Sequence, residues 1–476
     1  MLASSALLLN AACGVVVPAP ARSLSPIAGD AYALGFDFGT SGVRCAVVDA
    51  AGKVVVSPEG YAWGTTTERK QQASDWETAL HAQLAALPKE TCQRIERIAI
   101  SGTSGSMLLV EDTAKEDSDG SQSTCAVASR GSPRMYDFSV TRQAADGSGD
   151  RALTLLRDCA PAEHTVLSAT SALAKLLAYH MEAPLQGSER LAHQSDYISS
   201  RLTGGVPTSD WHNALKLGFD VRELRYPEWM TSGKLGEIIG GRLPEVVRPG
   251  EPIGAISAEI AARYGLPESC LVVGGTTDSI AAFLAAGAVE VGEAVTSLGS
   301  TVAIKLLSSL PVDDASRGVY SHRLGDRWLV GGASNAGCAV LREQGFDADE
   351  LAALSETIDP AAAPPHDNYY PLSANTVGER FPRPDDAAVG MLEPVPPERG
   401  AFLHCILHGI ARVEAEGYAA LAELGASPLA RVLTSGGGAQ NPTWTQMRER
   451  MLGVPTSRAA SIDAAYGAAM LAARGT

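Results

Sequence analysis

The amino-acid sequence predicts an α/β protein whose early and late halves are built on the same plan. Segments with the two-residue alternation of a strand lead into small polar turns, and segments with helical spacing follow. This order recurs in both halves, without a tandem repeat of about 20 to 50 residues. A chain of 476 residues is long enough for two or three domains with large buried cores.

Composition excludes several classes of partner. The formal net charge of -16 repels phosphate backbones and no basic run offsets it, so we expect no nucleic acid partner. The eight cysteines form no Cys-x-x-Cys pair and have no regular spacing, which predicts reduced thiols. Beyond the first 30 residues no segment has the length and apolarity of a transmembrane helix, so we expect no membrane partner.

Residues 1–30 differ from the rest of the chain. Ala, Ser, Leu and Pro dominate, and Arg22 is the only charged residue before Asp30. Low acidity and small residues favour an organelle transit peptide, with the globular pattern starting at Tyr32. We predict a plastid location (chloroplast stroma), with a secretory signal or a disordered tail as alternatives and a cytoplasmic location otherwise.

Residues 34–49 predict two strands joined by a polar turn. Leu34, Phe36 and Phe38 alternate with smaller or polar residues, and the alternation resumes after the turn Gly-Thr-Ser-Gly at 39–42. Glycines let the backbone curl closely around an oxyanion, and Asp37 is placed where a carboxylate can hold a cation's water. This is the chemistry of a polyphosphate cradle, although a plain hairpin turn has the same pattern.

The rest of the first half supplies further strands, helices and polar tips. Residues 53–56 predict a third strand, and the capping-box spacing at 74–77 opens a helix. A strand at 98–101 leads into a tip that carries Thr103 and Ser104, where open α/β sheets present groups to ligands. An ordinary Ser/Gly loop is the alternative reading of this tip.

Two polar segments follow. Residues 111–132 are acidic and rich in Ser and Gly, which predicts a surface excursion outside the core. Residues 208–214 mix polar and aromatic side chains, which fits either the wall of a substrate pocket or a capped helix start at Ser209 or Asp210.

The second half begins with a strand-to-helix junction. Residues 271–273 predict a strand, 274–279 its polar tip and 280–286 a helix. Asp278 lies at this junction beside glycines and hydroxyls. Its carboxylate can cap the helix or act as a general base, and the pattern leaves both roles open.

A second phosphate-sized hairpin comes next. Residues 294–298 and 302–306 predict strands around the turn Gly299-Ser300-Thr301. Residues 328–330 then lead into a Gly-rich loop and a helix.

The final part predicts a long helix at 401–424, a strand at 431–434, a wide glycine turn and two closing helices near 444–452 and 464–474. His404 and His408 lie one turn apart in the long helix. Since no Glu lies between them and their neighbours are apolar, we expect core residues and no zinc site.

Taken together, four motifs resemble the FGGY carbohydrate kinases, in their order and separation, over nearly all of residues 34–476. They are Asp37 to Arg44 (Asp-Phe-Gly-Thr-Ser-Gly-Val-Arg), Gly275 to Ser279, Ser297 to Thr301, and Gly436 to Gly438 with Asn441-Pro442. Neither a P-loop nor a Gly-x-Gly-x-x-Gly helix start is present in the sequence.

The resemblance implies a two-domain, actin-like ATPase (ribonuclease H-like) fold with ATP and sugar in an interdomain cleft. Residues 31–285 would form the N-terminal domain, on the sugar and phosphate side. Residues 286–476 would form the C-terminal domain, on the adenosine side, with the last helix packing on the first domain. A monomer or homodimer is expected.

The resemblance also implies roles for single residues. Asp278 would be the general base, Asp37 would organise Mg²⁺, and Thr40 would assist catalysis. The residues implied to contact ATP are Gly39, Thr40, Ser41, Arg44, Gly299, Ser300, Thr301, Gly436, Gly437, Gly438 and Asn441. Those implied to contact the sugar are Asp37, Thr103, Ser104 and Asp278.

Segments 332–337, 369–373 and 378–382 are similar to a plant and cyanobacterial branch of this family, which is understood as D-ribulose kinases. D-ribulose 5-phosphate is therefore the expected product. Many relatives carry an aromatic-x-Asp-x-Arg segment, but here Asp137 has no Arg at that spacing, so its contact with sugar is in doubt. The alternatives are a D-xylulose or other polyol kinase, a weakly active nucleotide and sugar sensor, and an actin-like structural ATPase.

Overall fold

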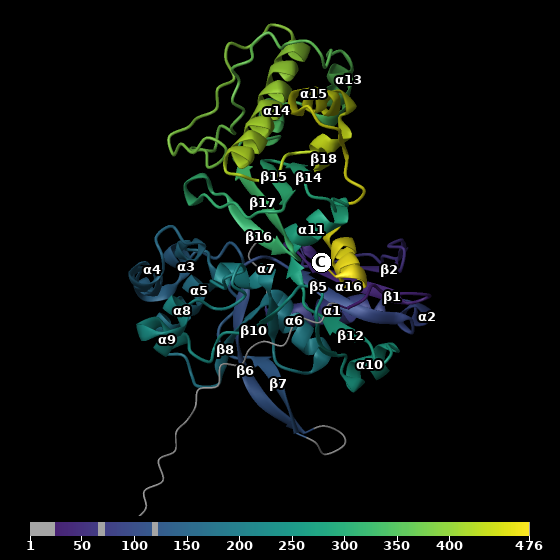
Figure 1. Ribbon diagram of the computed structural model, residues 1–476, viewed down its shortest axis with the longest axis vertical. Helices are drawn as coiled ribbons and strands as arrows, with labels where there is room; N and C mark the ends of the chain where they lie inside the picture. The colour runs from purple at the N-terminus through teal and green to yellow at the C-terminus, as the bar shows by residue number, and fades with distance from the viewer. Residues whose placement is uncertain (1–23, 65–71, 117–121, 476) are drawn as a thin grey trace, which may run out of the picture.

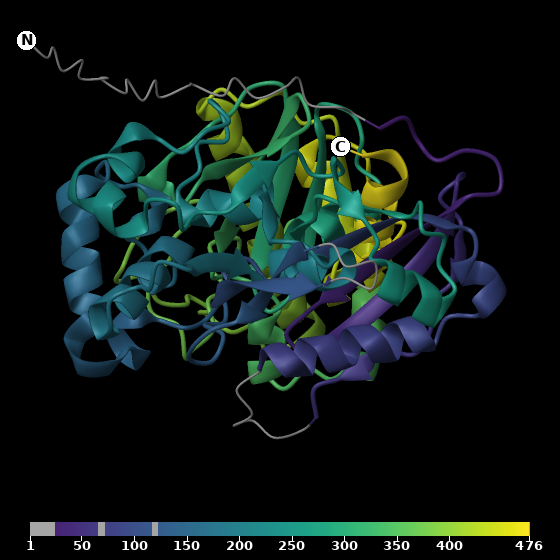
Figure 2. The same cartoon turned by 90° about the horizontal axis from the view of Figure 1, so that it is seen from below.

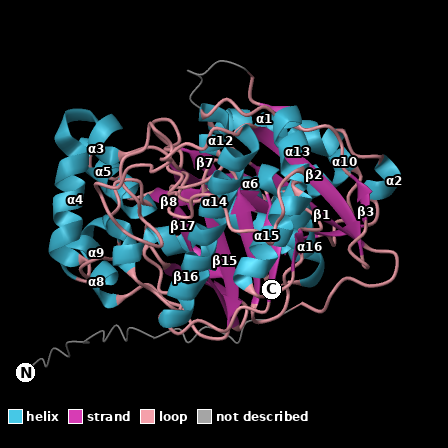
Figure 3. Ribbon diagram, turned by 90° about the horizontal axis from the view of Figure 1, so that it is seen from above, coloured by secondary structure: helices cyan, strands magenta, loops and turns pink. Residues whose placement is uncertain are grey.

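The computed structural model describes residues 24–64, 72–116 and 122–475. Most of the leader predicted at 1–30 therefore lies outside the described residues. The chain is built around two large sheets, one formed mainly by the first half and one by the second (Figure 1). Strands occupy the middle of the molecule and helices surround them (Figure 3). This arrangement confirms the predicted α/β class.

The first sheet has eight strands, with β1 and β5 at its centre. β1 pairs with β2 in the antiparallel sense and with β5 in the parallel sense, so the predicted hairpin and the predicted strand before Thr103 are neighbours. In sheet order the strands are β11 (Pro252–Ala255), β12 (Leu271–Val273), β5 (Ile95–Gly102), β1 (Tyr32–Phe38), β2 (Gly42–Asp49) and β3 (Val54–Val56), with β13 (Thr276–Thr277) on β5 and β4 (Tyr61–Ala62) on β2.

The second sheet has six strands and repeats the same local plan. β14 and β15 form an antiparallel hairpin, and β14 pairs in parallel with β18. In sheet order the strands are β16 (Tyr320–Leu324), β17 (Arg327–Ser334), β15 (Val302–Ser308), β14 (Glu293–Leu298), β18 (Arg431–Ser435) and β19 (Thr456–Arg458).

Helices cover both sheets. The helices before residue 290 are α1 (Ala73–Ala85), α2 (Lys89–Cys92), α3 (Val140–Gln143), α4 (Ser148–Cys159), α5 (Ala172–Glu182), α6 (Gln194–Thr203), α7 (Trp211–Ala214), α8 (Glu228–Thr231), α9 (Gly233–Ile239), α10 (Ala258–Tyr264) and α11 (Asp278–Ala286). The later helices are α12 (Ala339–Glu343), α13 (Ala348–Glu356), α14 (Arg399–Glu423), α15 (Pro442–Leu452) and α16 (Ala464–Arg474). The 3-10 turns are η1 (Ala145–Gly147), η2 (Thr165–Leu167), η3 (Leu215–Leu217), η4 (Ala315–Arg317) and η5 (Gly437–Gln440).

The surface excursion predicted at 111–132 contains regular strands, which the sequence did not predict. β6 (Met107–Glu116) and β7 (Gln122–Ala128) form an antiparallel hairpin, and β6 also pairs with β8 (Glu189–His193). The partner strand β8 lies far along the chain, so the pairing left no local signal. A short two-stranded sheet joins β9 (Thr208–Asp210) to β10 (Glu245–Val247).

The C-terminal helix α16 packs on the first sheet rather than on the second. It contacts β1, β2, β5 and α11 (Figure 2). A Cβ atom on Gly35 of β1 would lie 2.0 Å from the backbone nitrogen of Ala469, and one on Gly467 would lie 1.8 Å from the carbonyl oxygen of Ala281. Glycine is therefore required at both contacts of α16, at Gly35 where it meets β1 and at Gly467 where it meets α11, since any side chain there would strike backbone.

The packed chain begins before Tyr32. The side chain of Ile27 is buried, and its backbone N–H donates to the carbonyl of Ala473 in α16 at 2.9 Å. The expectation that the globular part starts at Tyr32 is therefore corrected: residues from about Leu24 onward belong to the core that α16 completes.

Two smaller expectations also change. The capping box of α1 uses Gln72 as the N-cap and Asp75 as its partner, rather than starting at Ser74. The six cysteines whose side chains are described are free thiols, as predicted. Within the described ranges, no helix combines the length and apolarity that crossing a membrane requires.

Candidate active site

Asp37 is the second-last residue of β1, and its carboxylate accepts hydrogen bonds from the two neighbouring strands. The side chain of Asp37 is buried; Ser101 on β5 donates its hydroxyl to Oδ1 at 3.0 Å, and Arg44 on β2 donates Nη2 to Oδ2 at 3.1 Å. Burial raises the pKa of the Asp37 carboxyl; the Ser101 hydroxyl and the Arg44 guanidinium oppose this, and the charge of Asp278 adds to it. Arg44, which the resemblance implies to bind nucleotide, forms an ion pair with Asp37 and keeps an exposed side chain.

The first predicted phosphate turn follows directly. The N–H of Gly39 donates to the carbonyl of Gly42 at 3.0 Å, and Trp63 donates its indole N–H to the carbonyl of Gly39 at 2.9 Å. These bonds fix the conformation of the turn and use the carbonyl oxygens of Gly42 and Gly39 as acceptors. The side chains of Thr40 and Ser41 are exposed, so both hydroxyls are accessible to a ligand.

The second predicted phosphate turn, between β14 and β15, is closed in the same way. The N–H of Gly299 donates to the carbonyl of Thr301 at 3.1 Å. Arg342 on α12 donates Nη2 to the hydroxyl of Ser300 at 2.9 Å. Arg342 could not be predicted, because α12 carries no motif and only the fold brings this guanidinium to the turn.

A cavity of about 410 Å³ opens beside this second turn. It contains three of the residues implied to contact adenosine, Gly437, Gly438 and Asn441, and it also contains Arg342. The other lining residues are Cys338, Leu341, Ala348, Leu351, Ala352, Ser355, Glu356, Leu407, Gln440, Pro442, Thr443 and Trp444. Mostly apolar walls with a few polar groups suit a nucleobase and ribose.

Gly436 and Asn441 shape this cavity, and the side-chain amide of Asn441 is already hydrogen-bonded within the protein. Gly436 has φ +83°, and a Cβ there would lie 2.4 Å from the carbonyl oxygen of Leu298, so only glycine fits. Asn441 caps α15: its Oδ1 accepts from the N–H of Trp444 at 2.9 Å, and its Nδ2 donates to Ser355 at 2.7 Å.

Asp278 is the first residue of α11 and does not cap it. The N-cap is Thr277, and the Asp278 carboxylate accepts a bond from the N–H of Ser279 at 2.6 Å. Burial raises the pKa of Asp278, while the Ser279 N–H and the ammonium groups of Lys305 and Lys216 oppose the rise. Because the charge of Asp278 in turn acts on Asp37, the fold brings the two predicted carboxylates together.

Two lysines beside Asp278 were missed by sequence reasoning. Lys305, on β15, donates to the carbonyl of Ser279 at 2.6 Å, and burial lowers its pKa to about 8. Burial also lowers the pKa of Lys216 on η3, and in both cases Asp278 opposes the shift. One lysine comes from each half of the chain, and neither lies in a motif, so no local pattern could have found them.

The predicted sugar-binding tip is only partly turned toward a ligand. Thr103 is buried, and both its N–H and its hydroxyl donate to Oε1 of Gln194 at 3.0 Å. By contrast, Ser104 Oγ, Gln194 Nε2 and Thr277 Oγ1 are buried without a hydrogen-bond partner among the described residues. Native proteins rarely leave such atoms unpaired, so a bound water or a polar ligand close to Ser104 and Thr277 would pair them.

The remaining candidates make no contact with Asp37 or Asp278 among the bonds that the described residues form. Asp137 is exposed, and the structure gives it no hydrogen bond to the predicted sugar tip within the described residues. No group of three or more His, Cys, Asp or Glu side chains in the described ranges is arranged to hold a metal ion, and this includes His404 and His408. Mg²⁺ needs only one or two carboxylates when phosphates complete its shell, so the single buried carboxylate of Asp37 beside the first turn fits that ion.

Comparison with known proteins shows that the sequence is similar to carbohydrate kinases. Residues 294–476 match the FGGY family of carbohydrate kinases, C-terminal domain. The chain is 24% identical over 439 residues to a xylulose kinase from Lactococcus lactis, covering 88% of this chain and 82% of that protein. It is 25% identical over 472 residues to a xylulose kinase from Bacillus subtilis, covering 94% and 88%.

Solved structures share the fold. A protein described as a xyloylose kinase from Brucella ovis has a TM-score of 0.74 at 24% identity, covering 94% of this chain and 91% of that chain. A xylulose kinase from Rhodospirillum rubrum also has a TM-score of 0.74, at 21% identity, covering 93% and 90%.

The two sheets, the paired hydroxyl turns and the sequence matches together define a sugar phosphotransferase with the actin-like ATPase fold. Residues 294–476 match the C-terminal domain of the FGGY carbohydrate kinases, and similarity to kinases of this kind implies ATP as the phosphoryl donor.

Proposed function

We propose that this kinase transfers the γ-phosphoryl group of ATP to a ketopentose, D-ribulose, and releases ADP and D-ribulose 5-phosphate. The observation that carries the proposal is the placement of Asp278. It begins a helix, is not used as a cap, and has a pKa raised by burial at the point where both halves of the chain meet. A raised pKa suits a carboxylate that must accept a proton.

In the proposed reaction Asp278 accepts the proton of the attacking sugar hydroxyl. That oxygen forms the new bond to the γ-phosphorus as the bond from γ-phosphorus to the bridging oxygen of ADP breaks. Little covalent chemistry is required of the protein, because positioning and charge stabilisation dominate phosphoryl transfer. The two lysines beside Asp278 favour its ionised form before the proton arrives.

The donor would lie between the two hydroxyl turns. Thr40 and Ser41 would hold phosphates from the first half, Ser300 and Thr301 from the second, and the cavity at Gly437 would take adenosine. Bound Mg²⁺ would neutralise phosphate charge, and Asp37 would hold it directly or through water. Ser101 and Arg44 fix the orientation of the Asp37 carboxylate for that role.

The acceptor class follows from the unpaired polar atoms. Ser104 Oγ, Gln194 Nε2 and Thr277 Oγ1 are two hydroxyls and an amide within reach of the Asp278 segment. A polyhydroxy compound can pair all three. The choice of D-ribulose rests on the resemblance of residues 332–337, 369–373 and 378–382 to the plant and cyanobacterial branch.

These three segments also act as one unit. Glu379 is buried and accepts bonds from Ser334 Oγ at 2.6 Å, Asn335 N–H at 2.7 Å and Tyr370 hydroxyl at 2.9 Å. They therefore carry one joint feature of the second half rather than three independent similarities.

D-Xylulose is the second candidate acceptor, because the relatives reported above are named xylulose kinases. ADP release measured over D-ribulose, D-xylulose, glycerol and hexuloses separates the two. The highest kcat/KM is expected with D-ribulose; a clearly higher value with D-xylulose contradicts the ribulose assignment. A polyol kinase would prefer glycerol or another polyol.

A weakly active sensor and an actin-like structural ATPase make different predictions in the same assay. The proposed kinase forms ADP only when sugar is added, with one sugar phosphate made for each ADP released. A sensor binds both ligands with negligible turnover, and a filament-forming ATPase is stimulated by its own concentration instead of by sugar.

We further propose that residues before Leu24 carry a plastid address, since Ile27 is already packed on α16 and any cleavage would precede it. A fluorescent reporter fused behind residues 1–30 is expected in chloroplasts. Uniform cytoplasmic or secreted fluorescence contradicts this proposal without affecting the kinase assignment.

A further inference from the structure

Arg448 and Glu414 form an ion pair inside the second half of the molecule. Their side chains are 1% and 0% exposed. Arg448 on α15 donates Nε to Oε2 of Glu414 at 2.6 Å and Nη2 to Oε1 at 2.7 Å, which is the two-pronged geometry of a strong charged contact. Burying two charges is costly, so a pair like this contributes little net stability compared with apolar residues of the same size.

The pair is tied to two neighbouring strands through threonine hydroxyls. Arg448 donates Nη1 to the hydroxyl of Thr434 on β18 at 2.8 Å. The hydroxyl of Thr296 on β14 donates to Glu414 and accepts from Tyr418 at 2.8 Å. Burial raises the pKa of Tyr418 far above its usual range, so its phenol keeps the proton that it donates. Thr296 and Thr434 face each other in the parallel register of β14 and β18.

These two threonines lie just before the two nucleotide-facing turns. β14 continues through Leu298 into the turn 299–301, and β18 continues into the glycine turn 436–438. The glycine turn also packs on the end of β14, since a Cβ on Gly438 would lie 2.8 Å from the Cβ of Leu298. A shift of one strand along the other would therefore displace both turns relative to each other.

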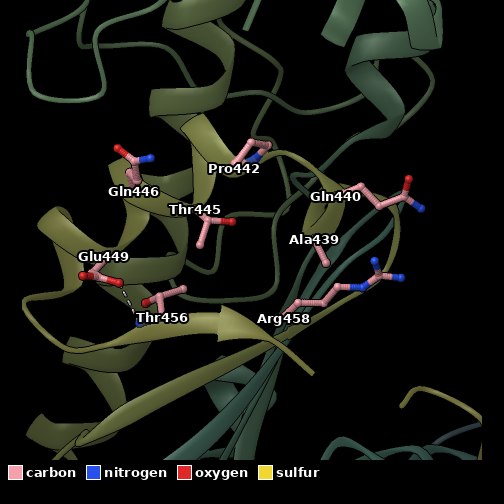
Figure 4. Close-up of a pocket in the computed structure, with 8 residues that line it drawn as sticks. All are labelled: Ala439, Gln440, Pro442, Thr445, Gln446, Glu449, Thr456 and Arg458. Atoms are coloured by element: carbon pink, nitrogen blue, oxygen red, sulfur yellow. Dashed lines mark hydrogen bonds between the residues drawn. The ribbon is translucent and has the colours of Figure 1, made fainter. Parts of the chain in front are cut away.

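The glycine turn packs on Leu298 and Trp444, and two cavities border it. On one side of η5 lies the cavity of about 410 Å³, and on the other lies an open cavity of about 620 Å³ (Figure 4). Gln440 lines both cavities, while Glu449 on the outer side bonds the N–H of Thr456. With space on both sides, the position of the turn depends on the strand and helix that carry it.

We propose that the Arg448–Glu414 pair is a positioning device for the nucleotide. It fixes the register of β14 and β18 and so sets the distance between the turn at 299–301 and the turn at 436–438. Arg448 also belongs to α15, the helix that starts at the adenosine cavity, so the same side chain locks that helix to both strands. This inference rests on the proposed function of these turns in binding ATP.

The test compares nucleotide binding with sugar use. Arg448→Lys keeps the charge but loses the two-pronged contact, and Thr434→Val and Thr296→Val each remove one hydroxyl link while the ion pair remains. We expect the Kd for ADP and the KM for ATP to rise about tenfold in Arg448→Lys, since a small displacement of a binding group has effects of that order or more. Smaller rises are expected in the two valine variants. The KM for sugar should not change.

A double variant separates positioning from stability. Arg448→Met with Glu414→Leu replaces the pair by apolar contacts, which commonly maintain or raise stability. The thermal midpoint should match or exceed that of the wild type, while the KM for ATP stays raised. If the KM for ATP returns to the wild-type value, the pair only fills the core and the proposal is wrong. If Arg448→Lys does not fold, the valine variants decide the same question.

A matched control lies on the same strands. Arg431 and Glu293 pair at 2.8 Å across β14 and β18, at the ends remote from the turns. Glu293→Gln should leave nucleotide binding unchanged. Calorimetry with ADP alone keeps this inference distinct from the proposed function: no ADP binding by the wild type contradicts the function, whereas equal binding by wild type, Arg448→Lys and Thr434→Val contradicts only the positioning role.

Discussion

Asp278 is the residue on which the proposed chemistry depends most. Asp278→Asn keeps the shape but removes the proton acceptor, so kcat should fall by roughly 10²- to 10⁴-fold. The KM for ATP should change little, because the nucleotide cavity lies elsewhere. Steady-state kinetics with D-ribulose measure both constants.

Asp137→Asn is the comparison variant, because Asp137 is an exposed aspartate without the Arg that accompanies the sugar-contacting Asp of many relatives. It should leave both constants unchanged. If Asp278→Asn retains nearly full turnover, the base is a different group. If Asp137→Asn loses activity with sugar, Asp137 contacts the acceptor after all.

Lys305, one of the two lysines beside Asp278, predicts a second limb in the pH dependence of turnover. Activity should rise as Asp278 loses its proton, at a pH above the usual aspartate range because burial raises that pKa. It should fall again near pH 8, where Lys305 loses a positive charge that can stabilise the phosphoryl group during transfer. A profile of kcat/KM against pH on both sides of that value checks the two limbs.

Lys305→Met assigns the alkaline limb. The fall near pH 8 should disappear, and the acid limb should move to higher pH because a positive charge that lowers the pKa of Asp278 is gone. An unchanged alkaline limb in this variant would mean that another group titrates there.

Sequence reasoning at the residue scale found groups that lie in local motifs. Asp37, Asp278 and the two hydroxyl turns could be predicted because each is marked by glycines or hydroxyls next to a strand end. Lys216, Lys305, Arg342 and Gln194 could not, because each acts on the site from a distant segment with no pattern of its own. The ion pair between Arg44 and Asp37 could not be predicted either, since an isolated motif does not reveal which neighbour a guanidinium contacts.

At the scale of elements, α11 carries Asp278 and is held by α16. Gly467→Ala would place a methyl group 1.8 Å from the carbonyl oxygen of Ala281 in α11. The helices must separate, which should lower stability by about 1–3 kcal/mol, as overpacking does. Turnover should fall as well, because α11 moves with its first residue. Thermal unfolding and kcat measure the two effects.

Gly187→Ala is the control for this substitution, because a Cβ at Gly187 meets nothing within 4 Å. It should be neutral in both measurements. A neutral Gly467→Ala would mean that the two helices can separate without moving the active site.

Most elements could be predicted from periodicity, including the hairpins, α11 and the long helix α14. The hairpin of β6 and β7 could not, because Ser, Gly and acidic residues obscure the alternation and its third strand, β8, comes much later. The parallel partners of β1 and β14, which are β5 and β18, could not be predicted either, since parallel pairing is set by the whole sheet.

At the scale of the whole molecule, α16 makes the first half dependent on the end of the chain. Ending the chain after Ile462 removes the helix that covers Ala33, Val48 and Val273, all of which belong to its core cluster. The shortened protein should unfold at a lower temperature and expose apolar surface. Dye binding and thermal unfolding test this, and an unchanged midpoint would show that the first half is complete without α16.

The dependence of β1 on α16 also bears on biosynthesis. Many multidomain chains fold their N-terminal domain while the rest is still being translated. Here β1 leaves the ribosome among the first strands, yet its covering helix α16 begins only at Ala464. The first half must therefore keep an apolar face open until α16 has been made, and chaperone binding to nascent chains should persist until then.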